Sequence, residues 1–86
     1  MKFWAKTIKD NKISTQTVWE RDGRINWAEM HDYMTEIAYQ LDIPTPIVIK
    51  THLFNFAKFN HVKFLKSDFV EKIDFDYLLV ENISDV

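Results

Sequence analysis

Apolar and polar side chains alternate along residues 2–20 of the chain. Together with the Thr, Val, Ile and Trp residues gathered there, this alternation predicts two β-strands, over Lys2–Lys9 and Lys12–Glu20. Asp10-Asn11 lies between them and tolerates positive φ angles, which favours a two-residue hairpin turn. The register that such a turn sets contains two cross-strand pairs: Ile8 with Ile13, and Trp4 with Thr17.

A single apolar stripe with helical spacing follows the hairpin. Asn26 is a favourable N-cap, and Pro44 ends the helix because it forces the preceding residue toward an extended conformation. The pattern therefore predicts a helix over residues 27–41, with Trp27 and Ile37 buried. The stripe spans an arc of about 100° and has six members: Trp27, Met30, Met34, Ile37, Ala38 and Leu41.

Two interpretations fit the segment after Pro44. Thr45-Pro46 is a favourable start for a helix, yet a helix over residues 46–59 would carry apolar side chains on all sides. We therefore favour an extended connector to about residue 50, followed by a short helix over residues 51–60. Whether residues 46–50 form strand, loop or helix stays open.

Two further patterns complete the chain. Ser67 is a good N-cap, and Asp68 and Glu71 after it favour the positive end of a helix of one or two turns. The apolar run within residues 75–82 predicts a strand that is paired and covered. Together these elements predict one domain, residues 1–86, with an α+β fold in the order β-β-α-α-(α)-β. Its three-stranded, mainly antiparallel sheet combines the N-terminal hairpin with the C-terminal strand, and the helices pack on one face.

Composition excludes several classes of site. The chain has no cysteine, so disulfides, thiol nucleophiles and thiolate metal sites are ruled out. Its single glycine excludes a glycine-rich phosphate loop, and its three serines lack a nucleophile-elbow context. No apolar run has the length of a signal peptide or a membrane span, so we expect a soluble, cytoplasmic domain without membrane contact.

The three histidines, His31, His52 and His61, lack the i, i+4 spacing that places two imidazoles on one face of a helix. Asp74 and Asp76 would share one face of a strand, where such a pair is usually solvated. We therefore expect neither a metal nor a cofactor. No set of acid, base and nucleophile is visible either, which argues against an enzyme.

Charge is distributed in blocks beneath a net charge of −2. Residues 26–49 carry four acids and no Lys or Arg, whereas residues 50–66 carry four Lys and no acid, interleaved with four Phe. Lys and aromatic rings in this arrangement can bind single-stranded nucleic acid, through phosphate contacts and base stacking. Alternatively, Phe54, Phe56 and Phe59 are core residues covered by the Lys stems, which is the interpretation we favour.

Two functions remain. The favoured one is a small non-enzymatic protein-interaction or regulatory module that binds another protein or a second copy of itself. The alternative is a nucleic-acid-contacting module that uses residues 50–66. The pI near 5.8 and the absence of Arg from this segment make it the weaker hypothesis. In either case the expected partner surface has seven members: Lys50, His52, Lys58, Phe59, His61, Lys63 and Lys66.

A resemblance to other proteins is carried by three segments: Phe3-Trp4-Ala5-Lys6, Phe54-Asn55-Phe56-Ala57-Lys58-Phe59, and Asp68-Phe69-Val70-Glu71 with Asp74-Phe75-Asp76. The chain resembles, over nearly its whole length, a family of short uncharacterised bacterial proteins of similar size. That family has no assigned activity, cofactor or partner. The resemblance therefore implies a free-standing bacterial domain and transfers no functional residue.

Overall fold

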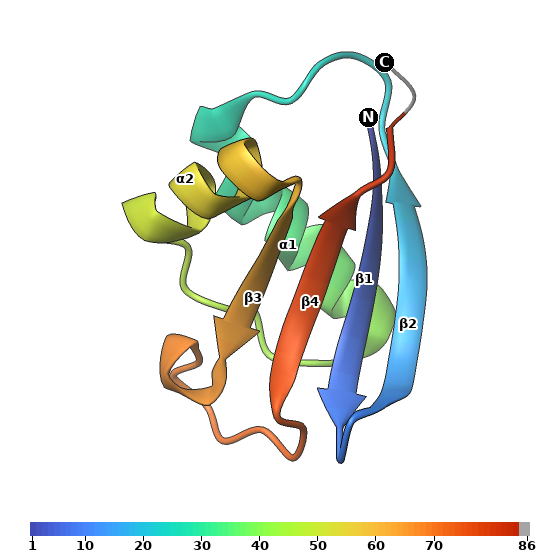
Figure 1. Cartoon of the computed structure of the whole chain (residues 1–86), viewed down its shortest axis with the longest axis vertical. Coiled ribbons are helices and arrows are strands. Elements are labelled where there is room, and N and C mark those ends of the chain that lie inside the picture. The colour runs from blue at the N-terminus through green and yellow to red at the C-terminus, as the bar shows by residue number, and fades with distance from the viewer. Residues whose placement is uncertain (85–86) are drawn as a thin grey trace.

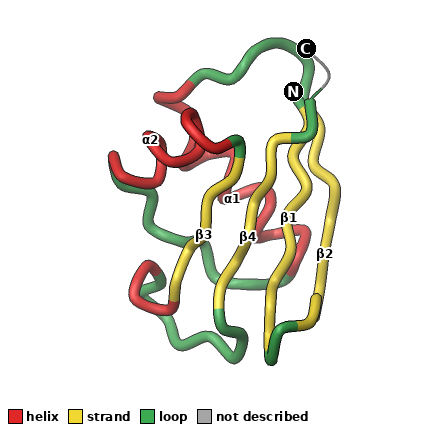
Figure 2. The backbone as a smooth tube through the Cα atoms, in the orientation of Figure 1, coloured by secondary structure: helices red, strands yellow, loops and turns green. Residues whose placement is uncertain are grey.

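The computed structural model describes residues 1–84, and residues 85 and 86 of the expected domain lie outside the described part. Four strands form one antiparallel sheet in the order β2-β1-β4-β3, and two helices cover one of its faces (Figures 1 and 2). The strands are β1 (Lys2–Lys9), β2 (Lys12–Glu20), β3 (His61–Leu65) and β4 (Tyr77–Asn82). The helices are α1 (Met30–Leu41) and α2 (Lys50–Phe59), accompanied by two 3-10 turns, η1 (Trp27–Glu29) and η2 (Lys66–Asp68).

The N-terminal hairpin is confirmed with the expected bounds, and its turn residues have positive φ angles of 52° and 64°. Ile8 pairs with Ile13 as predicted. The predicted pairing of Trp4 with Thr17 is wrong, because Trp4 lies opposite Val18. The register changes between Thr7 and Ile8, where β2 accommodates one extra residue and the ladder is locally irregular. With this shift, Trp19 pairs with Phe3, and its ring lies on the helix-covered face of the sheet.

The predicted helix over residues 27–41 is confirmed in extent, and its first turn is the 3-10 turn η1. Ile37 is fully buried, as expected. Trp27, however, is 38% exposed, so the prediction of its burial is wrong. A 3-10 turn has about three residues per turn, which rotates Trp27 away from the stripe that α1 buries. Tyr33 takes a place in the core instead.

The three-stranded sheet and the order β-β-α-α-(α)-β are wrong, because residues 61–65 form a fourth strand. The observed order is β-β-α-α-β-β. Within β3, Val62 and Phe64 point into the core and the residues between them point outward, which is the two-residue period of a strand. The predicted short helix is the turn η2, which begins at Lys66, so Ser67 lies inside it and does not cap it.

The second half of the chain otherwise matches the expected elements closely. Residues 43–49 form an extended connector without regular structure, and α2 follows within one residue of its expected bounds. The last strand is shorter than expected and begins at Tyr77. In residues 1–84, no helix has the length and apolar character needed to cross a membrane.

Phe3 lies at the centre of the core between the sheet and the helices, and it is fully buried. Its ring centroid is 5.2 Å from that of Trp19 in β2, 6.3 Å from that of Tyr33 in α1 and 5.0 Å from that of Phe56 in α2. One aromatic cluster therefore fixes α1 and α2 against the sheet. Both helices pack against this face, so no element within residues 1–84 covers the opposite face of the sheet (Figure 1).

Candidate functional site

His52, one of the seven residues of the expected partner surface, lies inside the molecule and is 7% exposed. Its Nδ1 accepts a hydrogen bond from the Ile49 backbone N–H at 3.0 Å, and its Nε2 lies 3.1 Å from Asp68 Oδ2. Its ring packs on Phe64, with 4.5 Å between the centroids. His52 therefore joins the start of α2 to β3 and η2, and it does not belong to an exposed surface.

The other six residues are exposed. Lys50 begins α2 and Lys66 begins η2, so these two stand apart at the ends of their elements. The remaining four gather where the C-terminal end of α2 leads into β3: Lys58, Phe59, His61 and Lys63.

A groove of about 340 Å³ lies between the last turns of α2 and the strand β3. We call it the α2–β3 groove, and it has six lining residues: Asn55, Phe59, His61, Val62, Lys63 and Leu65. Three of these were predicted as surface residues from the sequence. Asn55, Val62 and Leu65 were missed, because their place in the groove depends on β3 being a strand beside α2.

The aromatic residues of α2 divide between the core and the surface. Phe56 is 2% exposed, as expected, but the predicted burial of Phe54 and Phe59 is wrong, since they are 64% and 51% exposed. The Lys58 ammonium lies over both exposed rings, 5.7 Å from the Phe54 centroid and 5.3 Å from the Phe59 centroid. The His61 ring stacks on Phe59 with 6.1 Å between centroids. The Lys58 ammonium and the exposed Phe59 ring therefore occur together at the groove.

The strand β3 forms one edge of the sheet, and β4 is its only partner strand in the described residues. The Asn60 carbonyl accepts a hydrogen bond from the Asn82 N–H at 2.8 Å, and in an antiparallel pair such bonds recur at every second residue. Val62 and Phe64 therefore face β4 with their backbone groups. The N–H and C=O groups of His61 and Lys63 point away from the sheet, beside the groove.

The far end of this edge is capped. The Leu65 N–H donates to Asp68 Oδ2 at 2.8 Å, the same oxygen that contacts His52. This bond agrees with an outward direction for the backbone groups of alternate residues in β3. Because Asp68 occupies the last amide, the open part of the edge is centred on His61 and Lys63.

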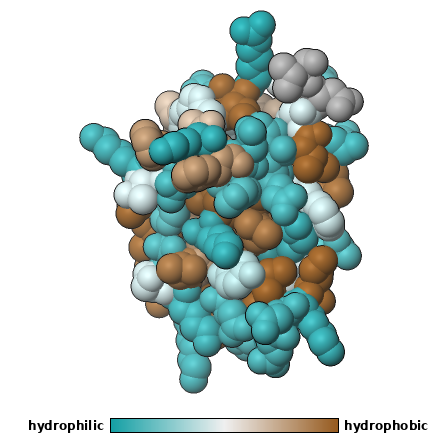
Figure 3. Space-filling model, viewed as in Figure 1, coloured by the Kyte–Doolittle hydropathy of each residue, from teal (hydrophilic) through white to brown (hydrophobic). Residues whose placement is uncertain are grey.

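The uncovered face of the sheet is a second candidate surface, on which polar and apolar side chains are interspersed (Figure 3). The Lys6 ammonium lies 3.5 Å from the Trp4 ring centroid and 2.7 Å from Glu81 Oε1. Lys63 similarly lies 4.8 Å from the centroid of Tyr77. The rings of Trp4 and Tyr77 are thus each covered by a Lys ammonium, and the charge of Lys6 is neutralised by Glu81. Little of this face is free to stack a nucleobase.

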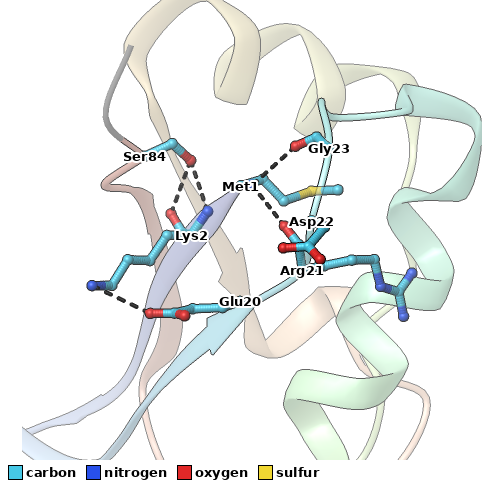
Figure 4. Close-up of a pocket in the computed structure, with 7 residues that line it drawn as sticks. All are labelled: Met1, Lys2, Glu20, Arg21, Asp22, Gly23 and Ser84. Carbon is cyan, nitrogen blue, oxygen red and sulfur yellow. Dashed lines mark hydrogen bonds and ion pairs between the residues drawn. The ribbon is translucent and has the colours of Figure 1, made fainter.

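A larger hollow of about 600 Å³ lies at the N-terminal end of β1 (Figure 4). The Met1 ammonium donates to the Arg21 and Gly23 carbonyls at 2.7 and 3.0 Å, and Lys2 Nζ lies 3.3 Å from Glu20 Oε1. The Met1 ammonium is therefore held by backbone carbonyls, and the Lys2 and Glu20 side chains pair with each other. Elsewhere within residues 1–84, no three His, Asp or Glu side chains come together as a metal-binding set.

Comparisons with models of protein families, with curated proteins and with solved structures find no match to the chain. The resemblance to a family of short bacterial proteins, like the cytoplasmic location, therefore stays a prediction.

Proposed function

We propose that this chain is a small non-enzymatic module that binds a segment of another protein in the α2–β3 groove. The observation that carries the proposal is the coincidence of an apolar groove with an open strand edge. Phe59 and Leu65 are each 51% exposed on either side of the groove. Exposed apolar side chains gathered in one place mark interaction sites more often than scattered ones do.

Two features make the groove suited to a polypeptide. Its apolar lining offers a place for an aliphatic or aromatic side chain, and the backbone groups of His61 and Lys63 offer hydrogen bonds to a neighbouring main chain. A strand edge that presents both is a common mode of peptide recognition. The groove also lies between two elements fixed by the core, so little ordering is required when a partner binds.

Nucleic acid is the second candidate function, favoured by one observation. The Lys58 ammonium and the His61 ring both lie against the exposed ring of Phe59, so a cation and rings that could stack on a base lie side by side. Against it, the whole chain has a net charge of −2, and a nucleic acid would make no use of the strand edge.

A selection of peptides from a random display library tests the proposal. Peptides enriched on the wild-type protein are expected to lose binding to a Phe59→Ser variant and to retain binding to Phe54→Ser. Phe54 is the matched control, because it is an exposed Phe of the same helix that also contacts Lys58 but lies outside the groove. Enriched peptides that are indifferent to Phe59→Ser would contradict the proposed site.

A titration with labelled single-stranded RNA and DNA at low salt addresses the second candidate. We expect no tight binding. Tight binding that is abolished by Lys58→Glu and Lys63→Glu, together with a steep loss of affinity as salt is raised, would replace the proposal by a nucleic-acid function.

A further inference from the structure

We infer that the partner segment is an extended acidic peptide that adds to the free edge of β3 as one more antiparallel strand. The inference rests on the proposed function, and it specifies how the partner binds and what chemistry it carries.

The register of β3 determines which of its backbone groups are free to pair with another strand. Val62 and Phe64 direct their backbone groups toward β4, and the Leu65 N–H is taken by Asp68. The N–H and C=O groups of His61 and Lys63 remain directed outward. An antiparallel strand placed there would exchange hydrogen bonds with both residues, as adjacent strands in the same sheet do.

The charge around the groove comes from residues 50–66, which carry four Lys and no acid. Lys63 lines the groove and Lys58 lies over the ring of Phe59 at its border. Two carboxylates of elements next to β3, Asp68 and Glu81, are already engaged. Asp68 contacts His52 and the Leu65 amide, and Glu81 pairs with Lys6 at 2.7 Å. The groove therefore presents positive charge that a partner with Asp or Glu would complement.

The two-residue period of strands orders these features along the peptide. Side chains opposite His61 and Lys63 lie on the uncovered face of the sheet, where acids meet Lys63. Side chains at the alternate positions lie on the side of α2, where Asn55 and Phe59 line the groove. We therefore expect acidic and apolar residues to alternate in the bound segment.

A second copy of this chain is a poor occupant of the edge. A two-fold pairing of β3 with itself centred on Lys63 would place two Lys63 side chains directly opposite one another, and like charges in that position are destabilising. Pairing of β3 with β2, the other edge strand, would be head to tail, so it would leave a free β2 edge and a free β3 edge in every pair of chains. The peptide of another protein meets neither obstacle.

The experiment uses the acetylated and amidated peptide Glu-Val-Glu-Val-Glu-Val-Glu, with binding followed by 15N chemical shifts and by amide hydrogen exchange. We expect slower exchange at the His61 and Lys63 amides on binding. Replacement of every Glu by Lys in the peptide, or Lys63→Glu in the protein, is expected to weaken binding by about tenfold or more, which corresponds to about 1.4 kcal/mol. The Lys72→Glu variant is the control for net charge, because Lys72 lies outside the groove.

N-methylation of the peptide separates strand addition from other modes. In the proposed register the Glu amides donate to β3 and the Val amides point away from it. Methylation of the Glu amides is therefore expected to abolish binding, whereas methylation of the Val amides preserves it to within about threefold. Equal effects of the two methylations would overturn strand addition.

The remaining outcomes distinguish this inference from the proposed function. If display-selected peptides bind through Phe59 but lack acids, or bind without protecting His61 and Lys63, the inference falls and the proposed function stands. If no peptide of either kind binds, both fall. A dimer in sedimentation experiments that protects the same two amides without peptide would replace the acidic peptide by a second copy of the chain.

Discussion

The two histidines nearest the groove provide a sharp test of how the site is built. His52 and His61 both belong to the basic block and are indistinguishable from the sequence pattern, yet the structure assigns them opposite roles. His52 is buried between Ile49 and Asp68, whereas His61 is exposed at the sheet edge. We predict that His52→Ala strongly destabilises the fold and that His61→Ala does not.

The magnitude follows from the contacts of His52. Its Nδ1 accepts a hydrogen bond from the Ile49 N–H, and its Nε2 lies 3.1 Å from Asp68 Oδ2. The hydrogen bond to Ile49 contributes about 1 kcal/mol net. Truncation to alanine also removes the His52 ring from its contact with Phe64, which adds a loss of packing. We expect His52→Ala to lower the free energy of unfolding by about 2–4 kcal/mol.

His61 supplies the matched control. Its ring touches Phe59 at the surface, so His61→Ala is expected to change the free energy of unfolding by less than about 0.5 kcal/mol. His52→Asn should fall between the two, because its side-chain oxygen can replace Nδ1 as the acceptor for Ile49 but cannot reach Asp68. Urea titrations followed by tryptophan fluorescence measure all three. Equal losses for the two alanine variants would refute the structural role of His52.

Two further variants test the helices by the same titrations. Ile37→Ala is expected to cost about 2–5 kcal/mol, because the side chain is fully buried, while Tyr39→Ala, at an 87% exposed position, should stay within about 0.5 kcal/mol. Equal effects would contradict the register of α1. Asn60 ends α2 with a φ of 59°, so Asn60→Gly is expected to be neutral or slightly stabilising and Asn60→Val to cost about 1 kcal/mol or more. A valine variant as stable as the wild type would contradict this helix end.

Glu36 is a poorer exposed control for α1 than Tyr39, although both lie outside the apolar stripe. The polar face of the predicted helix includes Glu36, and its position in the sequence suggests a solvated side chain. In the structure, Glu36 forms an ion pair with Arg21 and accepts a hydrogen bond from the Trp19 indole at 3.4 Å. Its removal would therefore disturb β2 as well as the helix surface.

The parts of the fold that could be predicted are those with a local cause. The hairpin depends on Asp10-Asn11, whose short polar side chains tolerate the left-handed conformation that the turn requires. The long helix depends on a stripe repeated over several turns. The register of the hairpin beyond Thr7 could not be predicted in the same way, because no residue type signals the irregularity that shifts it.

The strand β3 was missed for a physical reason. It has five residues, of which only Val62 and Phe64 are buried, and it becomes a strand by pairing with β4 much later in the chain. Lys and Phe also continue without a break from α2 into β3, so the sequence shows one basic segment where the structure has two elements. An edge strand is defined by strand order, which a local pattern does not contain.

The sequence therefore pointed to three of the six residues that line the groove, but not to the groove itself. Phe59, His61 and Lys63 were singled out by charge and aromatic content, and all three line the groove. The burial of His52 could not be anticipated, since it depends on an acid that arrives from η2. Leu65 could not be assigned to the groove from the sequence, because a single leucine beside lysines does not indicate a binding surface until the edge strand is known.

The alternation of β3 links the stability of the fold to the proposed binding surface. Val62 and Phe64 anchor the strand in the core and pair it with β4, and this holds the intervening His61 and Lys63 in a fixed register beside the groove. Substitutions at inward positions should consequently remove binding by unfolding the edge, and those at outward positions should remove binding from a folded protein. The groove can thus be altered without loss of the fold only through residues that contribute little to the core.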